Sequence, residues 1–281
     1  MLVMLCVLGG LGLAIPLCLC TGAFSGLQFL YLLPLWFVAG FLGVAALATL
    51  FLIVLVKRVD MNVLPDEDSP FYRRVAKIYI QALKTVLRLK IRTQGMEQLP
   101  KSGRFLLVCN HTANTDPVIL LHCFSDSQLA FISKRENDTM PFVGAFMRKL
   151  LCQPINREND REALKTILRC VQLIKEDKVS IGVFPEGYES IDGKLRRFRS
   201  GVLKIAQKAK VPIVVCTLHN ARPAMKRMLR GKSSQVELHL LRVLMPEEFE
   251  EITAVELGDR VYKMMAEDLG PENVYDYGED T

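Results

Sequence analysis

The sequence predicts an α/β domain with a mixed, mostly buried sheet flanked by helices, preceded by an N-terminal two-helix membrane segment. Residues 1–56 contain no Asp, Glu, Lys, Arg or His, so every charge of the 281-residue chain lies after them. Beyond that segment, short apolar runs typical of buried strands alternate with longer runs of helical periodicity. Intrinsic disorder is excluded, because 50% of the residues are hydrophobic.

Residues 1–56 are long enough to cross a membrane twice, because one helical crossing needs about 20 residues. We place the spans near residues 2–20 and 30–56, on either side of a break rich in glycine and hydroxyl groups. Lys57 and Arg58 follow, and such basic residues stay on the cytoplasmic side. We therefore predict an integral protein of the cell membrane with a cytoplasmic domain. A re-entrant hairpin would give the same sidedness, whereas a cleaved signal peptide would need a charged n-region.

Residues 57–92 are predicted to form a basic amphipathic juxtamembrane helix, with nine basic and four acidic residues. Asp68-Ser69-Pro70 is typical of a helix start, because it combines capping side chains with a proline near the first turn. Apolar residues then recur at helical spacing as far as Leu89. The basic face either lies against anionic lipid headgroups or is the solvated face of an ordinary packed helix.

Residues 93–269 are predicted to be the globular domain. We expect strands at 104–109, 129–133, 179–184, 211–218 and 235–243, and helices at 117–124, 141–150, 162–176, 199–210 and 254–269. The five cysteines of this domain lie mostly in apolar runs without a CxxC pair, which favours buried reduced thiols. Residues 270–281 contain four acids and are expected to be a frayed acidic tail.

The segment after the first strand of the domain carries the candidate catalytic pair, His111 and Asp116. A loop that follows a buried strand is where α/β proteins place reactive groups. A tight turn would let the carboxylate accept a hydrogen bond from one imidazole nitrogen, while the other nitrogen takes a proton from a substrate hydroxyl. The alternative is structural, with Asp116 as the N-cap of a helix that begins at Pro117.

The other three histidines, His122, His219 and His239, lie in apolar runs without the spacing of metal ligands. We expect them to be structural, and the sequence predicts no metal and no bound cofactor.

Further sequence blocks follow the His-x4-Asp segment, at residues 134–136, 140–144, 153–157, 183–190, 198–201 and 211–214. Their order and spacing resemble the glycerolipid acyltransferase family (PlsC-like), and within it the bacterial-type 1-acyl-sn-glycerol-3-phosphate acyltransferases, over residues 91–218. The resemblance implies that residues 93–269 are an acyltransferase domain.

The resemblance also implies residue roles. His111 is the general base and Asp116 its orienting partner. Arg157 is a contact to substrate phosphate, for which a guanidinium is well shaped; alternatively it forms a surface salt bridge with Glu158 or Asp160. The acceptor site is shaped by Phe184, Pro185, Glu186 and Gly187. Within that block, Glu186 binds an acceptor hydroxyl or braces the loop.

The third block departs from the family pattern, because Gly187-Tyr188-Glu189-Ser190 replaces the usual Gly-Thr-Arg-Ser. An acid at position 189 would weaken phosphate binding there. Basic residues follow that could supply compensating charge: Lys194, Arg196, Arg197 and Arg199.

The expected function is transfer of a fatty acyl group from acyl-CoA or acyl carrier protein to the sn-2 hydroxyl of 1-acylglycerol 3-phosphate, giving phosphatidate in phospholipid biosynthesis. The expected partners are the lysophospholipid, the acyl thioester and a bilayer containing anionic lipid, with no nucleic acid. Two alternatives remain open: an acyltransferase for another lysophospholipid or lipid acceptor, and a non-catalytic membrane lipid-binding module.

Overall fold

The structure is a computed structural model that describes residues 1–277. Its core is a seven-stranded sheet with the order β1-β7-β6-β2-β5-β3-β4. The strands are β1 (Leu89–Gln94), β2 (Leu106–Val108), β3 (Leu129–Lys134), β4 (Gln153–Ile155), β5 (Ser180–Val183), β6 (Ile213–His219) and β7 (Ser234–Leu244). From β6 to β4 all neighbours are parallel, whereas β7 is antiparallel to β6 and β1 is parallel to β7. The sheet is mixed, as predicted.

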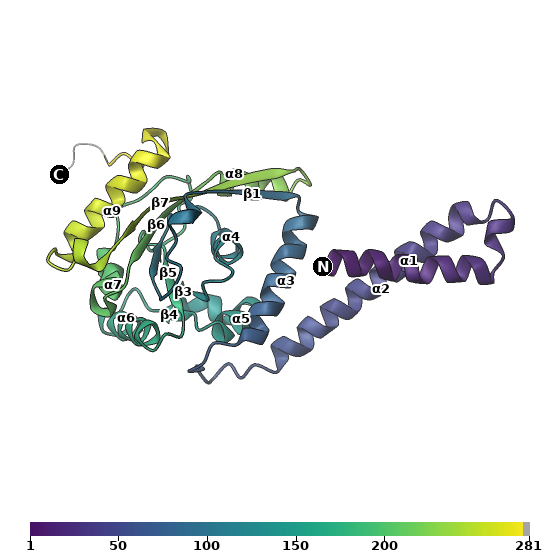
Figure 1. Cartoon of the computed structure of the whole chain (residues 1–281), viewed down its shortest axis with the longest axis horizontal. Helices are drawn as coiled ribbons and strands as arrows, with labels where there is room; N and C mark the ends of the chain where they lie inside the picture. Colours follow the sequence, from purple (N-terminus) through teal and green to yellow (C-terminus); the bar gives the residue numbers. More distant parts are fainter. Residues whose placement is uncertain (278–281) are drawn as a thin grey trace.

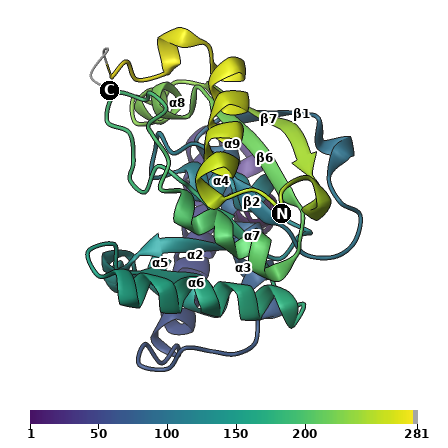
Figure 2. The ribbon, with the colours of Figure 1, turned by 90° about the vertical axis from the view of Figure 1, so that its left-hand side faces the viewer.

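Helices cover both faces of this sheet (Figures 1 and 2). The helices of the domain are α3 (Pro70–Val86), α4 (Asp116–Cys123), α5 (Val143–Lys149), α6 (Asp160–Lys175), α7 (Lys204–Ala209), α8 (Ala221–Met228) and α9 (Ala254–Leu269). In Figure 1, α6, α7 and α9 lie on one side of the sheet, and α3 and α4 on the other. The central strands β2 and β5 are buried along their whole length, as expected for strands covered on both faces.

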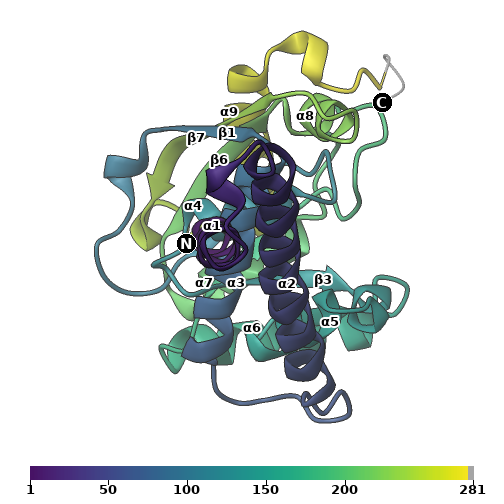
Figure 3. The ribbon, with the colours of Figure 1, turned by 90° about the vertical axis from the view of Figure 1, so that its right-hand side faces the viewer.

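The two N-terminal helices, α1 (Leu2–Cys20) and α2 (Phe29–Lys57), form an antiparallel hairpin that projects from the domain (Figures 1 and 3). Both helices are long and apolar enough to cross a membrane. Their backbones approach closely at Gly40, where an added Cβ would lie 2.6 Å from the carbonyl oxygen of Gly9. Such small-residue contacts are typical of helix pairs in membranes, where close backbone approach drives association.

The hairpin is attached to the domain through α3. Ser69 caps α3, accepting a hydrogen bond from the backbone N–H of Tyr72. Tyr72 is buried against Leu55 of α2, and its hydroxyl donates to the Leu55 carbonyl at 3.1 Å. The Tyr79 hydroxyl donates to the Ala48 carbonyl further along α2. Two aromatic residues of α3 therefore contact the long apolar helix directly.

Part of the basic face of α3 contacts the domain itself, as the packed-helix interpretation of the sequence requires. The Arg73 side chain is only 15% exposed, pairs with Asp68 at 2.7 Å and donates to the Leu129 carbonyl. Lys77 pairs with Asp126, and the Lys84 ammonium lies 2.8 Å from His122. Packing accounts for Arg73 and Lys84, whereas the Lys77 side chain is 58% exposed. Contact of the exposed basic residues with anionic lipid stays a prediction.

Three elements of the sheet and its helices differ from the sequence prediction. The predicted juxtamembrane helix ends early, and residues 89–94 form β1, which is hydrogen-bonded to β7. The sheet therefore begins before residue 93. Strand β4 and helix α8 were not predicted, because β4 has only three residues including a proline, and α8 is short with Pro223 in its first turn.

The described part of the predicted acidic tail, residues 270–277, is ordered rather than frayed. Val274 forms a bridge with Leu195, and the Leu195 N–H donates to the Asn273 carbonyl at 2.7 Å. The guanidinium of Arg196 lies 3.6 Å from the ring centroid of Tyr275. Backbone contacts with Leu195 and an aromatic contact with Arg196 thus order residues 270–277, which the acid content of the tail did not lead us to expect. Residues 278–281 lie outside the described residues.

Candidate active site

The sequence-predicted site residues lie at one edge of the sheet. His111 follows β2, the segment from Phe184 to Gly187 follows β5, and Arg157 follows β4. These three strands run in the same direction, as their parallel pairings through β3 require. In open α/β sheets this carboxyl edge is where ligands bind.

His111 and Asp116 form a preassembled pair. Asp116 Oδ2 lies 3.0 Å from His111 Nδ1 and also accepts the backbone N–H groups of Thr112 and Ala113, at 2.7 and 2.8 Å. The Asp116 side chain is fully buried, whereas that of His111 keeps 16% of its surface exposed. The carboxylate therefore fixes the proton on Nδ1 and leaves Nε2 as the nitrogen able to accept a proton.

The structural alternative for Asp116, an N-cap role, is wrong. Thr115 occupies the N-cap position of α4, and Asp116 is the first residue of that helix. The Asp116 carboxylate turns back to bind the loop that precedes the helix instead. Four residues separate the two side chains because this tight loop folds around a single carboxylate oxygen.

Phe184 fixes the plane of the imidazole. The Phe184 ring stacks on the His111 ring, with centroids 4.2 Å apart and an interplanar angle of 20°. The Phe131 ring in turn stacks on the Phe184 ring, with centroids 5.8 Å apart. The segment from Phe184 to Gly187 therefore contacts the candidate base directly through Phe184.

Glu186 braces the loops and does not project into a substrate space. One carboxyl oxygen accepts the backbone N–H of His111 at 2.8 Å, and the other accepts that of Arg196 at 3.0 Å. The side chain is 1% exposed. Burial raises the pKa of Glu186 from 4.5 to about 8, outweighing the two backbone hydrogen bonds that lower it. Of the two sequence-derived roles for Glu186, the geometry favours bracing.

Gly187 has a conformation and surroundings that exclude a side chain. Its φ is +83°, and an added Cβ would lie 3.0 Å from Cδ of Arg199. Only glycine adopts such a φ without strain. The backbone N–H of Arg199 also donates a hydrogen bond to the Pro185 carbonyl oxygen of this turn, at 2.8 Å. Gly187 thus lets the Arg199 side chain lie directly against the 184–187 turn.

Arg157 and Arg199 form a pair of neighbouring cations. Burial lowers the pKa of Arg157, the nearby charge of Arg199 lowers it further, and Glu136 partly opposes both effects. Within residues 1–277 neither guanidinium forms an ion pair, so the alternative of a salt bridge from Arg157 to Glu158 or Asp160 is not realised. Two neighbouring cations, of which neither forms an ion pair and only one is partly offset by the Glu136 charge, favour binding of an anion.

The acid that replaces the family arginine is neutralised by an arginine from elsewhere. Glu189 pairs with Arg222 of α8 at 3.3 Å. The same Nη1 atom of Arg222 donates to the carbonyl oxygens of Thr112 and Ser190, at 3.2 and 3.1 Å. Sequence reasoning missed Arg222, because α8 was not predicted and the partners are 33 residues apart. The ion pair moderates the repulsion between Glu189 and a bound phosphate that the sequence suggested.

The thiol nearest to the candidate base in sequence is a poor nucleophile. Cys109 is fully buried, and burial raises its pKa well above the ordinary value, with the charges of Cys216 and Asp116 adding to the effect. Burial likewise raises the pKa of Cys123 to about 12. The chemistry available at this edge is therefore proton abstraction by His111, without a thiolate intermediate from these residues.

Comparison with known proteins shows what this arrangement is similar to. Residues 90–219 match the family model described as Acyltransferase. A probable 1-acyl-sn-glycerol-3-phosphate acyltransferase of Mycoplasma pneumoniae is 34% identical over 59% of this chain and 61% of its own length. The 1-acyl-sn-glycerol-3-phosphate acyltransferases of Borreliella burgdorferi and Bacillus subtilis are each 28% identical, over 63% and 56% of this chain and 72% and 77% of their own lengths.

A solved structure has the same fold. The crystal structure of the 1-acyl-sn-glycerophosphate acyltransferase PlsC from Thermotoga maritima matches with a TM-score of 0.58 and 24% identity, covering 70% of this chain and 77% of that one. The resemblance seen in the sequence blocks is confirmed, because the stretch of the chain that matches the Acyltransferase family model, residues 90–219, contains them. The chain spans about three fifths of the length of its Mycoplasma pneumoniae relative.

Proposed function

We propose that this protein is a membrane-bound O-acyltransferase that esterifies the sn-2 hydroxyl of a lysophospholipid, with 1-acylglycerol 3-phosphate as the acceptor. The observation that carries the proposal is the His111–Asp116 pair, in which a fully buried carboxylate holds Nδ1 and leaves Nε2 accessible. A lipid-binding module would have no need of an oriented imidazole. The names of the relatives support the choice of acceptor class.

The reaction needs only groups of the chain and the two substrates. Nε2 of His111 takes the proton of the acceptor hydroxyl while the oxygen of that hydroxyl attacks the carbonyl carbon of the acyl thioester. The tetrahedral intermediate then expels the thiolate, which recovers the proton from the imidazolium. Asp116 stabilises that imidazolium, and Phe184 holds its ring in one plane. No metal or resident cofactor takes part, and acyl-CoA or acyl carrier protein supplies the thioester.

Arg157 and Arg199 supply the site for the acceptor phosphate in this proposal. Both lie at the edge that carries His111, and each could donate a planar fork of N–H groups to a phosphate. Arg199 replaces the family arginine that Glu189 has displaced. Arg196 and Arg197, by contrast, lie over Tyr275 and Tyr277 of the C-terminal segment.

An acceptor panel tests the assignment. Full-length protein in detergent would be offered acyl-CoA or acyl carrier protein with lysophosphatidate, lysophosphatidylcholine or a lipid alcohol, and thiol release would be followed. The proposal requires a preference for lysophosphatidate that Arg157→Ala removes by raising the acceptor KM, while Arg161→Ala, a matched change of an exposed arginine nearby, has little effect. Release of thiol without that preference would favour another lipid acceptor, and no release with any pair would favour the lipid-binding module.

The membrane arrangement is part of the same proposal. The α1–α2 hairpin spans the bilayer twice, and Lys57 and Arg58 at the end of α2 hold the domain on the cytoplasmic side. α2 is about 43 Å long at 1.5 Å per residue, so it exceeds a hydrocarbon core of roughly 30 Å and reaches the headgroups. Lysophospholipid would then reach the site from the adjoining leaflet.

A further inference from the structure

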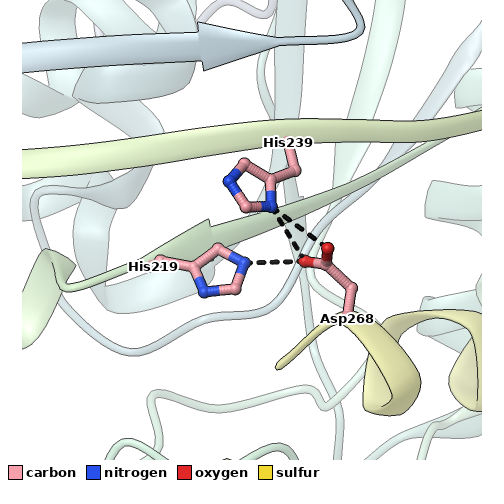
Figure 4. A group of neighbouring side chains, drawn as sticks. All are labelled: His219, His239 and Asp268. Atoms are coloured by element: carbon pink, nitrogen blue, oxygen red, sulfur yellow. Dashed lines mark hydrogen bonds and ion pairs between the residues drawn. The ribbon is translucent and has the colours of Figure 1, made fainter. Parts of the chain in front are cut away.

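A second cluster of titratable side chains lies apart from the His111 pair. It consists of His219 at the end of β6, His239 in β7 and Asp268 near the end of α9 (Figure 4). Strands β6 and β7 are antiparallel neighbours, and α9 covers them. The antiparallel pairing brings together two histidines that are 20 positions apart in the sequence. Figure 4 shows both rings turned toward the single carboxylate.

The donor atoms of this cluster are already close to the geometry of a metal site. His219 Nε2 lies 2.7 Å from Asp268 Oδ2, and His239 Nδ1 lies 3.1 Å from Asp268 Oδ1. One ligand atom from each residue lies within 4.8 Å of the others. Nitrogen and oxygen ligands of tetrahedral Zn²⁺ are about 3.3 Å apart, given bonds of about 2.0–2.2 Å. Only small side-chain rotations separate the two arrangements.

The outer nitrogen of His239 is an independent sign of a ligand. His239 Nε2 is buried and has no hydrogen-bond partner within residues 1–277, yet the carboxylate of Glu237 lies 3.9 Å away. Without a metal, Nδ1–H donates to Asp268, and Nε2 turns a bare lone pair toward Glu237. With Nδ1 bound to a cation, the proton moves to Nε2 and faces that carboxylate. Metal-bound histidines ordinarily have such an outer carboxylate partner.

We propose that His219, His239 and Asp268 bind one Zn²⁺ ion as a structural site. Two imidazoles and one carboxylate suit a borderline transition-metal ion and disfavour the hard cations Mg²⁺ and Ca²⁺. Thr217 Oγ1, which donates to Asp268 Oδ2, or a water completes the fourth position. Each neutral imidazole keeps its proton and moves it to the outer nitrogen. This proposal differs from the sequence expectation that His219 and His239 are structural, because their spacing in the sequence does not reveal a pairing across two strands.

The ion would connect three elements next to the catalytic loop. Residue 218, directly before His219, donates its backbone N–H to the Asn110 side chain at 2.7 Å and accepts the Asn110 amide at 3.0 Å. Asn110 directly precedes His111. A metal that fixes α9 to β6 and β7 therefore stabilises the strand against which the catalytic loop is held, without contacting substrate.

The test measures Zn²⁺ binding to the full-length, untagged protein in detergent, after EDTA treatment and removal of the chelator. Isothermal titration with ZnCl₂ is expected to give one equivalent per chain and a higher melting temperature. His239→Gln should weaken binding by more than about 100-fold, and Glu237→Gln, which keeps all three ligands, by roughly 10–100-fold. His122→Gln and His111→Ala are the controls and should keep the full equivalent.

The outcomes separate a metal site from a hydrogen-bonded cluster. Circular dichroism and thermal melting show whether each variant is folded. If His239→Gln is unfolded, Glu237→Gln alone decides the test. Weaker Zn²⁺ binding in both variants by the expected factors, with both controls unchanged, supports the site. The proposal is overturned if wild-type protein shows no saturable equivalent, if His239→Gln and Glu237→Gln bind Zn²⁺ with wild-type affinity, or if the equivalent disappears in His111→Ala.

Discussion

At the scale of single residues, the candidate site depends on two buried carboxyl groups with different tasks. Asp116 holds the imidazole and the loop around it through one oxygen. Glu186 joins that loop to the segment at Arg196 through two backbone hydrogen bonds. The first group must be ionised to stabilise an imidazolium, whereas burial raises the pKa of the second to about 8.

Replacement of Asp116 by Asn tests the charge separately from the shape. An amide oxygen can still accept the Thr112 and Ala113 N–H groups, so the loop should keep its geometry. The neutral side chain stabilises imidazolium poorly, and we expect turnover to fall by about 10²–10⁴-fold. Steady-state acyl transfer and thermal melting of the same preparation check this. Retained turnover in a folded Asn variant would exclude the orienting role.

The raised pKa of Glu186 predicts a pH-dependent stability. Between pH 4.5 and about 8 the unfolded chain has lost this proton while the folded protein keeps it, so stability falls as pH rises. The slope from this group is about 1.4 kcal/mol per pH unit. Glu186→Gln should lower the melting temperature at pH 6, because its NH₂ faces a backbone donor, yet flatten the decline toward pH 8. Glu189→Gln is the control; an unchanged decline in Glu186→Gln would contradict the assignment.

At the scale of elements, α8 supports the loop of the candidate base His111 from outside the family blocks. Arg222 contacts the carbonyl oxygens of Thr112 and Ser190 as well as Glu189. Its side chain is 22% exposed, so these contacts are partly shielded from water. The departure at position 189 is therefore part of a local arrangement of opposite charges.

A double-mutant cycle on this ion pair measures its role. Arg222→Met leaves two carbonyl oxygens and Glu189 without their donor, which costs about 1–3 kcal/mol of stability. It also leaves an uncompensated acid near the phosphate site, so the acceptor KM should rise. Arg222→Met should also lower turnover, because the loop loses its contacts with Arg222. Adding Glu189→Gln should restore the acceptor KM but not this turnover. Equal kinetics of the single and double variants would show that Glu189 does not influence the acceptor.

The elements differ in how far the sequence predicts them, and the reasons are physical. The bounds of α1 and α2 are predicted to within one residue, because the uncharged stretch ends abruptly at Lys57 and glycine marks the turn. His111 and Asp116 are predicted because a local turn joins them. The Glu186–His111 contact, the Arg222–Glu189 ion pair and the His219–Asp268 contact join residues 33 to 75 positions apart, which local periodicity does not encode.

At the scale of the whole molecule, the hairpin and the domain are joined at one end only. The turn between α1 and α2 lies far from the domain in Figure 1, whereas the end of α2 packs against α3 and α5 through the cluster around Tyr72. This arrangement predicts that residues 21–28 reach the opposite side of the membrane from the domain.

Cysteine labelling in intact cells checks that topology. Cys20 is exposed near the turn, so the background variant is Cys20→Ser, into which Ser25→Cys or Ser102→Cys is introduced. A membrane-impermeant maleimide should label the variant with Cys at 25 in intact cells, and the variant with Cys at 102, in an exposed loop of the domain, only after permeabilisation. Labelling of both positions from the same side would contradict two crossings.

The central claim is that His111 is the base for acyl transfer, and its replacement by Ala tests this most directly. The variant keeps the strand, the hairpin and Glu186, which binds the backbone rather than the side chain of residue 111. Acyl transfer from acyl-CoA or acyl carrier protein to lysophosphatidate would be measured in vesicles, with melting temperatures compared between wild type and variant. The account predicts a loss of at least about 10²–10⁴-fold in turnover with an intact melting transition. Near-wild-type turnover in the folded variant would contradict it.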